Sequence, residues 1–69
     1  MKHFKFSLIK QFREEKGMTQ VELARIMGEG ATKSQICSFE RGRGKGLTVR
    51  TLERLADALG KETGDFFGE

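Results

Sequence analysis

The chain has 69 residues, the length of one domain, and a chain this short buries only about 60% of the surface that its unfolded form exposes. A large enclosed active site is therefore not expected. The net charge is +3, but it is unevenly spread: residues 33–54 carry six basic and two acidic side chains, whereas residues 55–69 carry one basic and four acidic. The basic stretch allows a polyanionic partner without requiring one.

The chain holds one cysteine, Cys37, and one histidine, His3, so neither has the partners that a disulfide or a metal site needs. The first twelve residues interrupt every short apolar run with Lys, Gln or Ser. They form neither the apolar core of a signal peptide nor a membrane span of about 20 residues. We therefore expect a soluble cytoplasmic protein that uses no metal or other cofactor.

The first helix is expected to begin at Ser7, which is available as its cap. Leu8, Ile9 and Phe12 share one face, and Gly17 ends the segment. The preceding His-Phe-Lys-Phe alternates like a strand, but a lone strand of four residues has no obvious pairing partner. We therefore interpret residues 1–6 as an N-terminal arm.

The second helix has two independent start signals. Thr19 is followed three residues later by Glu22, which is the spacing of a capping box. Met18, before the cap, is placed to pack on Leu23 as a hydrophobic staple. Gly28 ends this helix.

The same pattern occurs twice more. Thr32 and Gln35 form the next capping box, which predicts a third helix over about residues 33–41 with Gly42 as its stop. Thr48 precedes a fourth helix, whose apolar face consists of Val49, Leu52, Leu55, Ala56 and Leu59, followed by Gly60.

A last short helix and tail are expected over residues 62–69, with Thr63 as the cap and Phe67 as the end. Short helices separated by glycines, with no proline and no convincing strand, predict one compact all-α domain that comprises residues 1–69. The expected number of helices is five.

Rotation by about 100° per residue sorts the third helix into two sides. Ile36 and Phe39 define the buried side. The opposite side is short, polar and basic at both ends, and consists of Lys33, Ser34, Cys37, Ser38 and Arg41. Such a surface suits a DNA groove about 12 Å wide, although a polar helix face is by itself more often plain solvated surface. Two short helices, a glycine-containing turn and a basic loop favour the DNA interpretation.

Three stretches carry a wider likeness: FREEKGMTQVELARIMG (12–28), TKSQICSFERG (32–42) and TVRTLERLADALG (48–60). They contain Thr-Gln-x-x-Leu-Ala, then Ile-x-x-x-Glu-x-Gly, then Leu-x-x-Leu-Ala-x-x-Leu-Gly. This combination is specific and resembles the Cro/repressor-type helix-turn-helix family, also called the XRE family, over most of residues 8–67. The resemblance implies a lambda-repressor-like domain in which the second and third helices, residues 19–42, dock on DNA.

The resemblance also implies roles for single residues. Gln20 contacts a phosphate and braces the reading helix. The positions that read bases are Lys33, Ser34 and Ser38. The other positions expected to hold the DNA backbone are Thr32, Gln35, Arg41, Arg43 and Lys45. Arg13 and Glu40 match a pair that forms a salt bridge between the first and third helices.

Two features depart from the family pattern. Residues 29–31 separate the second helix from the next cap, where relatives usually have one residue, and this longer turn is able to shift the third helix on DNA. The loop after Gly42 lacks the usual proline and is about one residue longer. Because its glycines make it flexible, we expect Arg43 and Lys45 to become ordered only on DNA.

The leading functional hypothesis is a regulator of transcription, usually a repressor, that is bacterial or phage-encoded and binds a double-stranded operator as a homodimer. The alternative is an antitoxin that also binds a partner toxin, with the acidic residues 62–69 as the candidate contact. An enzyme is not expected, because the chain lacks a nucleophile and base combination.

Four aromatic side chains near the ends of the chain are candidates for either the core or an interface with a second subunit: Phe4, Phe6, Phe66 and Phe67. At least one of the last two is expected in the core.

Overall fold

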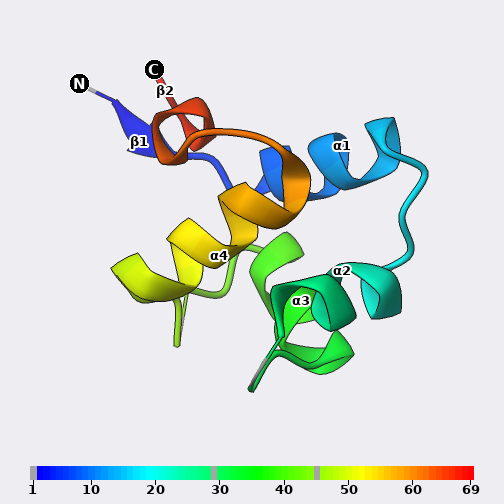
Figure 1. Ribbon diagram of the computed structural model, residues 1–69. Coiled ribbons are helices and arrows are strands. Elements are labelled where there is room, and N and C mark those ends of the chain that lie inside the picture. Colours follow the sequence, from blue (N-terminus) through cyan, green and yellow to red (C-terminus); the bar gives the residue numbers. More distant parts are fainter. Residues whose placement is uncertain (1, 29, 45) are drawn as a thin grey trace.

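The computed structural model describes residues 2–28, 30–44 and 46–69, and four α-helices dominate it. They are α1 (Ser7–Glu15), α2 (Gln20–Met27), α3 (Lys33–Glu40) and α4 (Val49–Leu59). A single 3-10 helix, η1 (Thr63–Phe66), follows, and two short strands, β1 (His3–Phe4) and β2 (Phe67–Gly68), lie at the ends of the chain. In Figure 1 the two strands lie together at the top of the view, whereas α2 and α3 lie at the bottom.

Three of the helices begin at a threonine, as the sequence predicts. The hydroxyl groups of Thr19, Thr32 and Thr48 each accept a hydrogen bond from the backbone N–H three residues later, at 3.1, 3.1 and 3.2 Å. At α2 the carboxylate of Glu22 accepts in return from the Thr19 N–H at 2.9 Å, which completes the capping box. Each cap satisfies a donor that the helix itself leaves without a partner.

The start of α1 differs from the prediction. Its N-cap is Phe6, which makes no side-chain capping bond, and Ser7 is the first residue of the helix. The prediction of Ser7 as the cap was therefore wrong. Phe6 is instead half-buried against the core, so apolar packing rather than a polar cap fixes where this helix begins.

The helices enclose one hydrophobic core. α2 packs on both α3 and α4, and α1 packs on α3. The side chains with no exposed surface come from four helices and from η1, and they are Ile9, Leu23, Ile36, Phe39, Leu55, Leu59 and Phe66. The apolar faces predicted from helical spacing therefore meet in a common interior.

The N-terminal segment is a strand and not a free arm. β1 pairs antiparallel with β2, so that His3 lies opposite Gly68 and Phe4 opposite Phe67. The Lys5 N–H adds a bond of 2.7 Å to the Phe66 carbonyl. The interpretation of residues 1–6 as an arm was therefore wrong for His3 and Phe4. Their alternation was noted in the sequence, but the pairing partner lies at the opposite end of the chain, where no local pattern indicates it.

The expected fifth α-helix is a single 3-10 turn. Its N-cap is Glu62 rather than Thr63, and the Glu62 N–H donates to the carboxylate of Asp65 at 2.9 Å. η1 buries Phe66 against the rings of Phe4 and Phe12, whose centroids lie 6.0 and 5.2 Å from it. The chain is therefore mostly helical, with four α-helices and a small terminal sheet in the part that the structure describes.

Candidate nucleic-acid interface

Helix α3 presents two different sides, as its sequence predicts. Ile36 and Phe39 have no exposed surface and anchor it in the core. On the other side Lys33, Ser34 and Arg41 are exposed, and a half-buried pair, Cys37 and Ser38, lies between them. The exposed side is therefore a short polar surface with a basic residue at each end.

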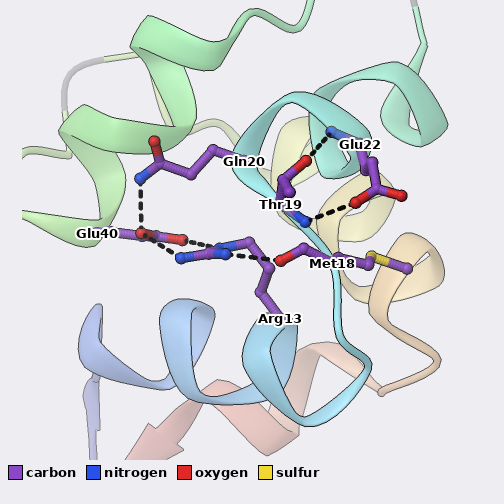
Figure 2. A network of polar contacts seen from close by, with 6 residues as sticks. All are labelled: Arg13, Met18, Thr19, Gln20, Glu22 and Glu40. Carbon is purple, nitrogen blue, oxygen red and sulfur yellow. Dashed lines mark hydrogen bonds and ion pairs between the residues drawn. The ribbon is translucent and has the colours of Figure 1, made fainter.

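A buried ion pair holds α3 against α1 (Figure 2). The Arg13 Nε donates to Glu40 Oε2 at 2.7 Å, and Arg13 Nη2 donates to Glu40 Oε1 at 3.2 Å. The two side chains are only 11% and 6% exposed. The hydrogen bond that Arg13 donates to Glu40 raises the pKa of Arg13 above its usual value, so the guanidinium is charged at every physiological pH.

Two further bonds bring α2 into this network. Gln20 Nε2 donates to Glu40 Oε1 at 2.9 Å, and Arg13 Nη1 donates to the Met18 carbonyl at 2.7 Å. Figure 2 shows Gln20 reaching from the start of α2 to the end of α3. The network therefore sets the positions of α1, α2 and α3 relative to one another. The bond from Arg13 to Met18 could not be predicted from residue types, because its acceptor is a backbone carbonyl.

A hollow of about 690 Å³ lies at the N-terminus of α2. Its lining includes Gly17, Thr19, Gln20 and Lys33. The first N–H groups of a helix have no partner within it and favour an anion such as phosphate. The Glu22 N–H already donates to the Thr19 hydroxyl, so the backbone N–H groups of Gln20 and Val21 are the donors of this turn that suit a phosphate.

The longer turn before α3 does not rotate that helix out of the core, since Ile36 and Phe39 remain fully buried. Residue 29 lies outside the described residues. The Ala31 N–H donates to the Gly28 carbonyl at 3.2 Å, and Ala31 packs against the core. The buried side of α3 is therefore the one predicted, and the effect of the longer turn on base contacts stays a prediction.

The backbone directly after α3 folds back on the end of that helix. Gly42 has a φ of +88°, and the Arg43 N–H donates to the Ser38 carbonyl at 2.9 Å. The expectation that Arg43 and Lys45 become ordered only on DNA stays a prediction. Lys45, named with Arg43 as a contact to the DNA backbone, lies outside the described residues.

The remaining predicted contacts surround α3. Thr32 is exposed and caps the helix, and Arg41 is exposed at its end. Gln35 is half-buried, and a Cβ added to Gly46 would lie 3.8 Å from its amide nitrogen. Gln35 therefore lies between α3 and the following loop.

α2 and α3 are two short helices joined by a glycine-containing turn. A buried polar network holds α3 in place, and its exposed side is polar and basic. This arrangement defines a helix-turn-helix domain. The family model named HTH_3, Helix-turn-helix, matches residues 9–66. The chain belongs to this family, the Cro/C1-type or XRE helix-turn-helix proteins. Membership supports DNA-binding transcription regulation in general.

The fold is also similar to part of a solved enzyme. The hydroxypropylphosphonic acid epoxidase from S. wedmorenis matches with a TM-score of 0.80 and 32% identity over 91% of this chain. Structures of FeII HppE in complex with substrate and of apo-HppE match equally well. The chain spans only about a third of their length: 32%, 35% and 34%.

A comparison with curated proteins found no match. Within residues 2–28, 30–44 and 46–69, no helix is long and apolar enough to cross a membrane.

Proposed function

We propose that this chain binds a specific double-stranded DNA sequence through α3 in the major groove and thereby represses transcription. The observation that carries the proposal is the exposed side of α3, with Lys33, Ser34 and Ser38 on it. A major groove accepts a helix, and short hydroxyls and a lysine are able to bond base edges there.

Rigidity of the helix supports base reading. Arg13, Gln20 and Glu40 tie α3 to two other helices, so its exposed side keeps a fixed orientation before DNA arrives. The N-terminus of α2 and the side chains of Arg41 and Arg43 flank this side and supply contacts to phosphates. Phosphate contacts position such a protein, and base contacts specify its site.

We further propose that two copies bind a two-fold symmetric operator, with half-sites about one helical turn apart. We also propose that the protein acts in the cytoplasm of a bacterial cell, where its DNA site lies. The antitoxin role stays the alternative, with residues 62–69 as its candidate contact: Phe66 is buried, whereas the acidic side chains of Glu62 and Asp65 are exposed. The likeness to the epoxidase concerns about a third of that enzyme, and we do not extend its activity to this chain.

The test is selection of a random DNA library with the purified protein at about 150 mM salt, where nonspecific binding is weak. We expect enrichment of one motif made of two symmetric halves. An asymmetric motif would support sequence-specific DNA binding but contradict binding by two symmetric copies. Recovery of unselected DNA would contradict the proposal and favour a protein partner.

Two serine variants make the test specific to α3. Ser34→Asp places a carboxylate on the exposed side of α3, whereas Ser7→Asp places one in the first turn of α1. Both positions are exposed, and an acid in the first turn of a helix favours its stability. We expect Ser34→Asp to abolish the selected motif and Ser7→Asp to retain it. Equal loss in both variants would contradict the assignment to α3.

A further inference from the structure

The chain reverses direction immediately after α3. Gly42 adopts a left-handed φ of +88°, its N–H donates to the Phe39 carbonyl at 3.0 Å, and the Arg43 N–H donates to the Ser38 carbonyl at 2.9 Å. These two bonds form the Schellman motif that ends many helices at a glycine. The backbone of Arg43 therefore lies beside the last turn of α3 and does not trail away from it.

This reversal places Arg43 at the same surface hollow as two residues of the exposed side of α3. The hollow has a volume of about 340 Å³ and is lined by Ser34, Gln35, Ser38 and Arg43. Ser34 and Ser38 are four residues apart, and positions with that spacing lie on one side of a helix. Their side chains are short, which leaves room above them for a larger group.

The loop is also supported from its far side. A Cβ added to Gly44 would lie 3.2 Å from the Cζ of Phe6, so the loop backbone rests closely on that ring. Phe6 itself packs against the core. The Ser38 carbonyl and the ring of Phe6 therefore contact the backbone at Arg43 and Gly44, and Arg43 lines the hollow.

We propose that Arg43 determines sequence specificity by reading a guanine next to the bases that Ser34 and Ser38 meet, instead of only contacting the DNA backbone. The guanidinium presents a planar fork of donors that matches the O6 and N7 acceptors of guanine in the major groove. Arg41 is exposed at the helix end, outside this hollow, and keeps the role of a phosphate contact. This inference rests on the proposed DNA binding.

The test compares three variants in the same library selection, followed by titration of the selected duplex over a range of salt. Arg43→Ala removes the fork, Arg43→Lys keeps the charge but not the fork, and Arg41→Ala is the matched control. Arg43 and Arg41 are both exposed, so melting curves of all variants are expected to stay close to the wild type.

For both Arg43 variants we expect the wild-type motif to lose its preference for guanine at one position of each half-site, with other positions unchanged. Affinity for the wild-type motif is expected to fall about tenfold to a hundredfold in Arg43→Ala. Arg43→Lys is expected to keep the salt dependence of the wild type. Arg41→Ala is expected to weaken binding to all sequences alike and to reduce the salt slope by about 1.

The outcomes separate this inference from the proposed function. If Arg43→Ala selects the unchanged wild-type motif and only lowers the salt slope, Arg43 is a phosphate contact and the inference is wrong, while the DNA-binding proposal stands. If the wild-type protein selects no motif, both are wrong.

Discussion

The carboxylate of Glu40 and the guanidinium of Arg13 come from residues 27 positions apart in the chain, and two hydrogen bonds of 2.7 and 3.2 Å join them in the interior. A buried charge is costly unless its partner and its remaining hydrogen bonds are all present. Here Gln20 supplies a further donor to Glu40, and the Met18 carbonyl accepts from Arg13. The pair therefore joins three helices in a single arrangement.

Arg13→Met is expected to lower the free energy of unfolding by about 3–5 kcal/mol, because it leaves the Glu40 carboxylate buried without a counter-charge. Urea unfolding followed by circular dichroism measures this loss. The double variant Arg13→Met with Glu40→Met is expected to lose less than the single variant, since it buries no unpaired charge. An unchanged unfolding midpoint for Arg13→Met would contradict the role given to the pair.

Glu22 makes the start of α2 sensitive to pH. The backbone N–H and the side chain of Thr19 hydrogen-bond to its carboxylate and lower the pKa of Glu22 from its usual 4.5. Because the folded-state pKa is the lower one, the stabilisation is complete above about pH 4.5 and is lost as the pH falls through the folded-state value.

The matched variant is Glu22→Gln, which keeps an oxygen acceptor but does not titrate. The wild type is expected to melt at a higher temperature than this variant at about pH 6, and the difference is expected to shrink towards about pH 3. A difference that stays constant over this range would show that the carboxylate charge does not stabilise α2.

Gly42→Ala tests the reversal after α3. The φ of +88° at Gly42 is unfavourable for any residue with a Cβ, although a Cβ there would meet nothing within 4 Å. The expected cost is about 1–2 kcal/mol, from backbone strain alone. Gly64→Ala is the control, because Gly64 has no positive φ and its Cβ would also meet nothing within 4 Å. Equal melting temperatures for the two variants would exclude such strain at Gly42.

Phe66 and Phe67 are neighbours in the chain with different expected contributions to stability. Phe66 has no exposed surface, whereas Phe67 is 39% exposed. Phe66→Ala is expected to cost about 3–5 kcal/mol through the cavity it leaves. Phe67→Ala is expected to cost clearly less, and thermal melts of both variants compare them directly. If Phe67→Ala is the more destabilising of the two, the packing described for η1 and β2 is incorrect.

The sequence predicted those parts of the fold that depend on local chemistry. Thr19, Thr32 and Thr48 cap their helices because a hydroxyl bonds the N–H three residues later, and this relation lies within a few positions of the chain. The buried and the exposed side of α3 were predicted from helical spacing alone. Local chemistry was not enough at Ser7, where the packing of Phe6 decides the start of α1.

Long-range relations were harder to predict. The pairing of β1 with β2 depends on the whole fold bringing two short segments together, and two-residue strands carry almost no pattern. The position of Arg43 depends on one backbone dihedral angle at Gly42, which a glycine permits but does not require. The base-reading and phosphate-contacting assignments on α3 remain predictions for DNA-binding experiments.

The terminal sheet has a consequence for the order in which the domain assembles. Pairing His3 with Gly68 closes a loop of nearly the whole chain, and its entropic cost is repaid only after the helices between them have packed. β1 and β2 should therefore join last on folding and separate first on warming. We therefore expect a partly opened form in which the helical core persists while both ends of the chain are released.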